Sequence, residues 1–197
     1  GIDPTSMMTG LTFKSNINID NEISILKSFS LTERTLKELE FFNVSYFVTG
    51  RVATRELYKD TPFNVELDYD SLQVVGNKYS IEFIDNEQYR LKSKEDRCVL
   101  YDYNKDENIA FVELPEYEGV YRFGEWVSNG FNRFRIVLNS NYDPEPKEDE
   151  IKLKYSFIVK SRLDLMREFS NLTIAQTSKT SSILNLSLQG QNPQKIT

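Results

Sequence analysis

The chain has 197 residues, 39% hydrophobic and 13% aromatic, so it is long and apolar enough to build a folded core. Its net charge of −6 at pH 7 argues against a nucleic-acid-binding protein, because binding to phosphate backbones depends on clustered Lys and Arg. It contains no histidine and a single cysteine, Cys98, which excludes Ser-His and Cys-His catalytic pairs, a disulfide within the chain and a metal cluster built on thiols.

The first part of the chain carries helical signals followed by a strand. Asp20 is placed to cap a short helix that reaches about residue 29. The sequence Ser30-Leu-Thr-Glu33 has the spacing of a capping box, so a second helix is predicted from here to about Phe42. Residues 43–51 then alternate between apolar and polar side chains, which predicts a strand.

The middle of the chain reads as a series of short strands. Alternating segments recur every ten residues or so with no helical period, and Gly, Asn, Asp and Pro separate them. This spacing predicts antiparallel β structure, as in a small sandwich or open barrel. The predicted strands are residues 63–67, 79–84, 89–92, 99–103, 109–114, 131–138 and 153–159. The same region is acidic, with 20 Asp and Glu against 12 Lys and Arg between residues 64 and 157, and we expect a solvated surface.

Helical signals return near the C-terminal end. Ser161 can cap a helix that contains Leu165 and Phe169, and residues 172–176 and 184–188 alternate as strands. Gly190 ends the last strand, and Asn192-Pro193 has the form of an N-cap followed by proline at the first helical position. We therefore expect the chain to be a segment of a longer protein in which a long helix begins here.

The order of these elements predicts an α+β fold. We expect a mixed-sheet base domain with helices that carries a β-rich antiparallel insertion. The base domain is placed at residues 8–63 and 158–197, and the insertion at residues 64–157. Residues 1–7 resemble the remnant of an expression vector and are left out of the fold prediction.

Three segments, in order along the chain, resemble motifs of the Wzz/Wzc-type polysaccharide co-polymerases. This family comprises chain-length determinants and the tyrosine autokinases of capsule and exopolysaccharide export. Residues 21–28 resemble its segment near the first membrane helix, residues 56–65 its Leu-Tyr…Pro-Phe strand entry, and residues 181–193 its closing strand and Asn-Pro helix start. The positions that carry the resemblance are Glu22, Ile25, Leu26, Ser28, Leu57, Tyr58, Pro62, Phe63, Ile183, Leu184, Gly190, Asn192 and Pro193.

The resemblance implies a scaffolding domain on the periplasmic side of the bacterial inner membrane, within a two-pass membrane protein. Its implied partners are further copies of the parent, the polysaccharide polymerase, the export machinery, and the membrane through flanking helices. It implies no catalytic residue, cofactor or metal in this segment, and any kinase domain would be separate and cytoplasmic. In agreement, the sequence has no Gly-x-x-x-x-Gly-Lys-Ser/Thr phosphate loop.

One acidic segment imitates a calcium loop. Between Asp102 and Glu113, acidic and amide side chains stand at the spacing of the oxygen ligands in an EF-hand. However, Glu107 occupies the position where the sharp turn requires glycine, and the flanking residues alternate as strands. We therefore predict a β-hairpin with a polar tip and no calcium site.

The alternative function is a secreted or periplasmic carbohydrate-binding β module. In that case Trp126 and neighbouring tyrosines would stack on sugar rings. Aromatic residues on strands are more often core or cross-strand pairs, so we expect most of Trp126 to be buried. Cys98 lies in an apolar, strand-like segment and is expected to be a buried, inert thiol.

Overall fold

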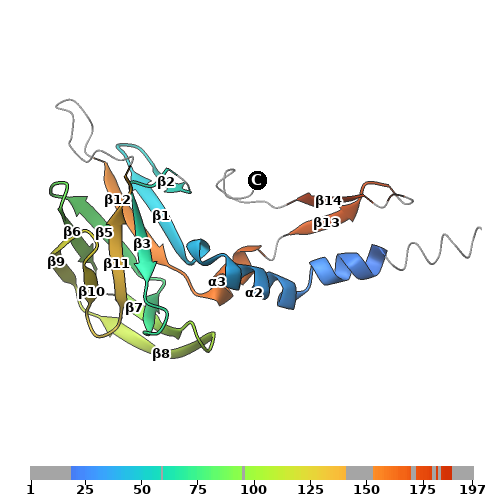
Figure 1. Ribbon diagram of the computed structural model, residues 1–197, viewed down its shortest axis with the longest axis horizontal. Helices are drawn as coiled ribbons and strands as arrows, with labels where there is room; N and C mark the ends of the chain where they lie inside the picture. Colours follow the sequence, from blue (N-terminus) through green and yellow to red (C-terminus); the bar gives the residue numbers. More distant parts are fainter. Residues whose placement is uncertain are drawn as a thin grey trace, which may run out of the picture.

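The computed structural model describes residues 19–58, 60–94, 96–140, 153–169, 172–178, 181 and 183–187. They form two regions, which Figure 1 shows as a β body at one end and a thinner arm at the other. The β body consists of β1 (Val44–Thr49), β2 (Thr54–Leu57), β3 (Phe63–Leu67), β4 (Gln73–Val75), β5 (Lys78–Phe83), β6 (Gln88–Ser93), β7 (Asp96–Asp102), β8 (Glu107–Leu114), β9 (Tyr117–Arg122), β10 (Trp126–Ser128), β11 (Arg133–Leu138) and β12 (Lys154–Val159). The arm consists of helical residues 19–26, α2 (Phe29–Glu38), α3 (Arg162–Phe169), β13 (Thr173–Gln176) and β14 (Leu184–Ser187). The short helix η1 (Glu40–Asn43) joins the arm to β1.

The larger sheet of the β body has the strand order β2-β1-β12-β5-β6-β9, and every neighbouring pair is antiparallel. Val44 pairs with Val159 and Thr49 with Lys154, so two strands more than 100 positions apart in the sequence lie side by side. Alternate residues of β6 are buried, as expected for a strand with one face on a core and one face on solvent.

A second sheet, with the order β10-β11-β3, packs against the larger one through a shared aromatic core. Phe157 of the larger sheet has ring centroids of Tyr79 at 5.1 Å and of Phe134 at 5.5 Å. The shared core comprises Val44, Val48, Leu57, Phe63, Val65, Leu67, Val75, Tyr79, Ile81, Tyr89, Leu91, Tyr101, Tyr103, Val127, Phe134, Ile136, Tyr155, Phe157 and Val159. The two sheets therefore form a sandwich whose interior is largely aromatic and β-branched.

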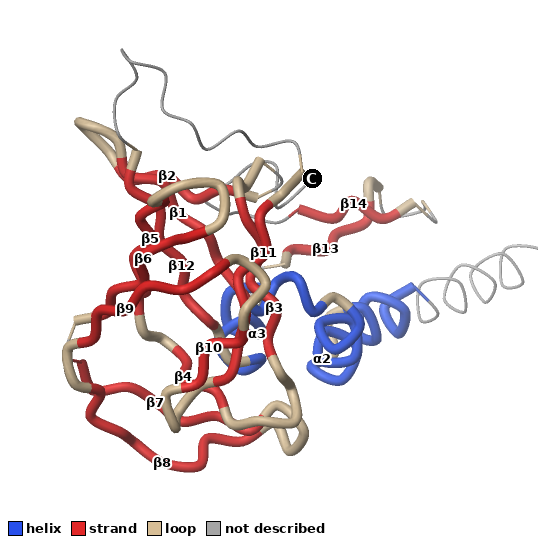
Figure 2. The backbone as a smooth tube through the Cα atoms, turned by 60° about the vertical axis from the view of Figure 1, so that its left-hand side comes forward, coloured by secondary structure: helices blue, strands red, loops and turns tan. Residues whose placement is uncertain are grey.

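The third sheet, β4-β7-β8, runs along the rim of the body (Figure 2). It has a small core of its own made of Val74, Cys98 and Leu114. The buried side chain of Asn132 ties it to the sandwich, because its Oδ1 accepts from the Val74 N–H at 2.6 Å. The prediction that Cys98 is a buried thiol is confirmed, and burial raises its pKa.

The arm has a much smaller core. Leu36 of α2 packs on Leu165 and Met166 of α3, with Phe42 and Phe169 against them. Ser28 begins α2, because its Oγ accepts from the Leu31 N–H at 3.2 Å. The predicted capping box at Ser30 is therefore wrong by two residues. The predicted cap of α3 is confirmed, since the Asp164 N–H donates to Ser161 Oγ at 3.0 Å.

The predicted α+β fold class is wrong. Among the described residues 49% lie in strands and 20% in helices, and every strand pair is antiparallel. The expected mixed sheet of a base domain is absent from the described residues, because β1 pairs with β12 and enters the same antiparallel sheet as β5. The helices α2 and α3 pack on each other rather than forming a layer over a sheet. The protein is thus mostly β.

The boundaries proposed from the sequence fall inside strands. The boundary between residues 63 and 64 lies in β3, and the boundary between residues 157 and 158 lies in β12. Val44, Val48 and Val159, which were assigned to the base domain, belong to the same core as Tyr79 and Phe134 of the predicted insertion. In the described structure, hydrogen bonding and packing run continuously across both boundaries.

Candidate functional site

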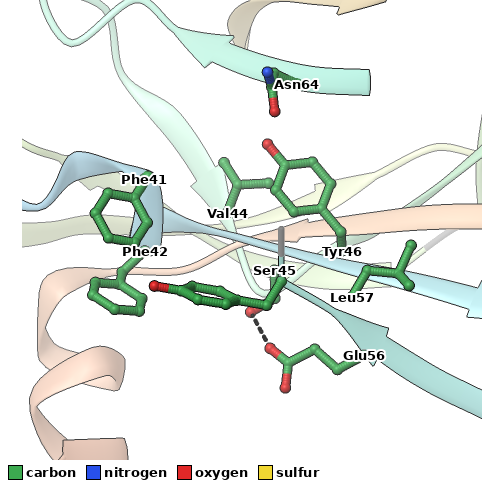
Figure 3. Close-up of a pocket in the computed structure, with 9 residues that line it drawn as sticks. Phe41, Phe42, Val44, Ser45, Tyr46, Glu56, Leu57 and Asn64 are labelled. Atoms are coloured by element: carbon green, nitrogen blue, oxygen red, sulfur yellow. Dashed lines mark hydrogen bonds between the residues drawn. The ribbon is translucent and has the colours of Figure 1, made fainter. Parts of the chain in front are cut away.

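A small pocket lies where the arm meets the β body (Figure 3). It is lined by Phe41, Phe42, Val44, Ser45, Tyr46, Glu56, Leu57, Tyr58 and Asn64. Its volume is about 80 Å³. Pockets that enclose a small-molecule ligand measure roughly 300–1,000 Å³, so this one has room for a side chain or a few waters rather than a whole ligand.

The polar groups of the pocket are already engaged with one another. Ser45 Oγ donates to Glu56 Oε1 at 3.0 Å across strands β1 and β2 (Figure 3). The Val65 N–H donates to the Tyr46 hydroxyl at 2.9 Å, while burial raises the pKa of Tyr46 to about 12, so its phenol stays protonated at neutral pH. The Ser45 hydroxyl faces a carboxylate and no imidazole, since the chain has no histidine. The pocket therefore offers a carboxylate beside an aromatic wall.

Aromatic rings connect this pocket to the arm. Phe42 of η1 stacks with Tyr58 at 6.1 Å between centroids and meets Phe169 of α3 edge-on at 5.3 Å. Phe41 lies beside Phe42 and is largely exposed. The junction between arm and body is thus packed by rings from η1, α3 and the segment after β2.

A charged cluster holds the tip of the β7–β8 hairpin against both helices of the arm. We call Asp106, Lys37 and Arg162 the hairpin clamp. Lys37 Nζ of α2 lies 2.8 Å from Asp106 Oδ2, and Arg162 Nη1 of α3 donates to Asp106 Oδ1. The same Arg162 nitrogen donates to the carbonyl of Tyr103 at 2.6 Å, and the Tyr101 hydroxyl donates to Asp106 at 3.1 Å. One carboxylate therefore joins α2, α3 and the body.

The electrostatics of the clamp follow from this geometry. Burial of the Asp106 carboxyl raises its pKa, but hydrogen bonds from Lys37 and Arg162 outweigh burial and hold the pKa below its usual value. The hydrogen bond to Asp106, followed by the one to Glu33, raises the pKa of Lys37. Asp106 also adopts a left-handed backbone with φ of 56°, which places its side chain at the turn and is tolerated by Asp better than by most residues.

Tyrosines support the clamp from the body side. Tyr103 meets Tyr101 edge-on at 4.9 Å and Tyr69 edge-on at 5.1 Å, and the Arg162 guanidinium lies 5.4 Å from the Tyr103 ring. Burial raises the pKa of all three phenols, so they remain neutral hydrogen-bonding groups. Asn43 Nδ2 of η1 donates to the Tyr69 hydroxyl at 3.0 Å, which adds a second polar link between arm and body.

The acidic segment that imitates a calcium loop is the tip of this hairpin. Residues 103–106 form the turn between β7 and β8, so the predicted hairpin is confirmed. Asp102 Oδ1 accepts from the N–H groups of Asn104 at 2.9 Å and Lys105 at 3.2 Å. With Asp106 committed to the clamp, the carboxylates do not converge on a common point. Among the described residues, no group of three or more acidic or cysteine side chains could hold a metal ion.

A third feature lies on the outward face of the β10-β11-β3 sheet. Trp126 is 38% exposed, so most of its surface is buried, as expected, but it lies on the solvent-facing side of the sheet and not in the core. The guanidinium carbons of Arg135 and Arg133 lie 5.0 Å and 5.3 Å from its ring centroid. Arg135 pairs with Glu66 at 2.5 Å and Arg133 with Asp68 at 3.1 Å. An aromatic ring and two ion pairs therefore share one solvent-facing surface.

The described positions that carry the family resemblance are spread over the arm, the junction and the β body. Glu22, Ile25 and Leu26 lie on helical residues 19–26, and Ser28 caps α2. Leu184 begins β14 of the arm hairpin and Ile183 directly precedes it, whereas Leu57 and Tyr58 line the pocket at the junction. Pro62 and Phe63 are buried at the entry to β3. The predicted positions Gly190, Asn192 and Pro193 lie outside the described residues.

Sequence reasoning missed the hairpin clamp. Asp106 was considered only as part of the calcium-like spacing, and neither Lys37 nor Arg162 was singled out. One sequence feature could have indicated part of the clamp: Arg162 directly follows the Ser161 cap, which places a positive charge at the start of α3. The three residues are at least 56 positions apart in the sequence, so no local spacing indicates that their side chains meet.

No helix in the described part of the chain is long and apolar enough to cross a membrane. A comparison of the sequence with protein-family models and with curated proteins found no similar family or relative.

Proposed function

We propose that this chain is the scaffolding region of a polysaccharide co-polymerase on the periplasmic side of the bacterial inner membrane. In this role it takes part in chain-length control and export of capsular or exopolysaccharide. It acts by binding further copies of itself, the polymerase and the export machinery, and no catalytic step is assigned to it. The three motifs, which follow one another in the expected order, suggest this role.

The observation that carries the proposal is the apolar surface of the arm. Four large apolar side chains there face solvent: Ile25 at 56% exposure, Phe29 at 65%, Ile183 at 66% and Leu186 at 54%. Ile25 and Ile183 are also positions of the family motifs. Exposed apolar side chains gathered at one end of a soluble domain are typical of an association surface. Figures 1 and 2 both place the helices and the β13–β14 hairpin at this end.

The backbone of the arm hairpin favours the same role. β13 pairs only with β14 among the described strands, so each strand keeps an outer edge with unpaired N–H and C=O groups. Such edges accept a further strand or a neighbouring chain. Apolar side chains and a free strand edge at one end suit reversible association of copies.

Sedimentation velocity from micromolar to millimolar concentration tests the assembly step. We expect the chain to associate weakly and reversibly, and Phe29→Asp and Ile183→Asp to shift association to higher concentration. Val52→Asp is the matched control, because Val52 is 98% exposed but lies in the turn between β1 and β2, outside the arm. If both arm variants associate as the unmodified chain does, the arm is not the association surface.

The biological role requires a test in the organism that carries the gene. There we expect Ile183→Asp to change the length distribution of surface polysaccharide on gels, while Val52→Asp leaves it unchanged. Immunoblotting must show normal amounts of both variants. An unchanged distribution with Ile183→Asp at normal protein level would contradict the proposed function.

A further inference from the structure

The outward face of the β10-β11-β3 sheet combines one exposed ring with paired charges. The inward residues of this sheet, such as Val127, Phe134 and Val65, are buried in the sandwich core. Alternation along each strand therefore fixes the other set of side chains on solvent. We call this set the outer face; it comprises Trp126, Ser128, Arg133, Arg135, Asn64 and Glu66.

The strand register places three of these side chains in one row. Trp126 pairs with Arg135, and Arg135 pairs with Glu66. Neighbouring strands lie about 4.8 Å apart, so the row spans roughly 10 Å from ring to carboxylate. Arg133 and Asp68 form a second ion pair beside it, and Arg133 also lies over the Trp126 ring. The outer face thus presents aromatic, donor and acceptor groups in a fixed order.

The charges on the outer face balance. Arg135 is matched by Glu66 and Arg133 by Asp68. Any charged ligand, whether anionic or cationic, would meet as many groups of like charge as of opposite charge. Charge complementarity therefore favours a neutral ligand that can both donate and accept hydrogen bonds. Ion pairs this exposed stabilise a fold very little, so stability alone gives no reason for the arrangement.

We propose that the outer face binds a neutral pyranose sugar of an oligosaccharide chain. The indole ring of Trp126 stacks on the C–H face of the sugar, whose slightly positive hydrogens are attracted to the electron-rich ring. The Arg135 guanidinium donates to one ring hydroxyl and Glu66 accepts from the next, so a vicinal pair of hydroxyls fits the ion pair. The planar fork of arginine and the two oxygens of a carboxylate suit such bidentate contacts.

Other ligands fit this surface less well. Proline-rich peptides bind grooves lined by several aromatic side chains, whereas the outer face presents one ring. Single-stranded nucleic acid requires a positively charged groove, which balanced ion pairs do not provide. The inference does not rest on the proposed scaffolding role, because it concerns a different surface from the arm. Binding of sugar and association of the arm can therefore fail independently.

Intrinsic fluorescence reports on the site directly, because Trp126 is the only tryptophan in the chain. The purified chain is titrated with maltohexaose, cellohexaose and mannohexaose as neutral probes, and with oligogalacturonate and a proline-rich peptide for comparison. We expect a saturable change in Trp126 emission with at least one neutral glycan and none with the other two ligands. No response to any neutral glycan, or a response only to the acidic glycan or the peptide, overturns the proposal.

Calorimetry with the responding glycan locates the contact. We expect Trp126→Ala to abolish binding and Glu66→Gln to weaken it at least tenfold. Phe111→Ala is the matched control, because Phe111 on β8 is 69% exposed and has the Arg97 guanidinium 5.1 Å from its ring, yet lies on another sheet. All variants must show the melting transition of the unmodified chain. Unchanged affinity in Trp126→Ala, or equal loss in Phe111→Ala, contradicts the assignment.

Discussion

The β body and the arm are stabilised by very different amounts of buried surface. The shared core of the body contains 19 buried residues, and eight of them are aromatic: Phe63, Tyr79, Tyr89, Tyr101, Tyr103, Phe134, Tyr155 and Phe157. The core of the arm contains three buried residues, Leu36, Leu165 and Met166. Because hydrophobic stabilisation grows with buried apolar area, the body is expected to hold most of the free energy of unfolding.

The hairpin clamp connects these unequal regions. Asp106 belongs to the β7–β8 hairpin of the body, whereas Lys37 and Arg162 belong to the helices of the arm. Removing this carboxylate would leave Arg162, which is mostly buried, without its charged partner. The arm therefore depends on the body through a polar contact, while the larger core of the body gives it no comparable dependence on the arm.

The largest effect is expected from truncation of the body core. Phe157→Ala removes a fully buried ring that touches Tyr79 and Phe134, and should lower the free energy of unfolding by about 3–5 kcal/mol. Leu165→Ala in the arm should cost about 2–3 kcal/mol, because the small core around it can collapse into the space. Urea unfolding followed by circular dichroism measures both. Equal losses would contradict the difference between the two regions.

Loss of the clamp should come next in size. Asp106→Asn keeps the shape and the tolerance for a left-handed backbone but removes the charge that Arg162 and Lys37 share. We expect a loss of about 2–3 kcal/mol, as for hydrogen bonds to charged groups. Amide hydrogen exchange should rise in α2 and α3 before it rises in β5 or β12. Lys37→Met is the matched control and should cost less, because Lys37 is far more exposed than Arg162.

The two regions should also respond to opposite extremes of pH. The pKa of Asp106 lies below its usual 3.8, so the clamp stabilises the fold above that pH and loses this contribution as the pH falls further. The pKa of Tyr46 is raised from 10.0 to about 12, so its contribution to the body is complete below pH 10 and declines as the pH rises toward 12. Urea midpoints measured from pH 2.5 to 11.5 should show both losses. Asp106→Asn should reduce the acid loss and leave the alkaline loss unchanged.

Most strands of the β body could be predicted from the sequence alone. Each of the seven segments predicted between residues 63 and 159 overlaps an observed strand, because alternation and turn residues are local signals. β2, β4, β9 and β10 were missed. β4 and β10 are three residues long, and Gly119 interrupts the alternation of β9. The fold class was wrong because the pairing of β1 with β12 joins residues more than 100 positions apart, which no local pattern encodes.

The candidate site was harder to predict than the strands. Trp126 was expected to be mostly buried, and it is 38% exposed. Its place on the outward face was not predicted; it follows because the neighbouring Val127 is buried and fixes the alternation of the strand. The clamp depends on three charges brought together by tertiary packing, and single charged residues carry no local pattern. Several positions of the motif resemblance lie on the arm and at the junction, but the resemblance predicted neither region and gave no information about which residues face solvent.

A smaller effect tests where α2 begins. Ser28→Ala removes the side-chain oxygen that accepts from the Leu31 N–H and should destabilise the arm by about 1 kcal/mol. Ser30 lies inside α2 and is exposed, so Ser30→Ala should change stability little, although the sequence pattern had favoured Ser30 as the cap. Hydrogen exchange of the first turn of α2 measures both. A larger effect of Ser30→Ala would contradict the observed cap.

The smallest effect is expected from calcium. The acidic spacing between Asp102 and Glu113 would suit an ion only if the loop wrapped around it, but Asp102 accepts hydrogen bonds from its own turn and Asp106 is held by the arm. Binding would have to break the clamp and would therefore weaken the contact between the two regions. We expect millimolar calcium to leave the melting temperature essentially unchanged, with millimolar magnesium as the control for ionic effects. A rise of several degrees with calcium alone would mean that the native state binds the ion, since a ligand that binds only the native state stabilises it by mass action.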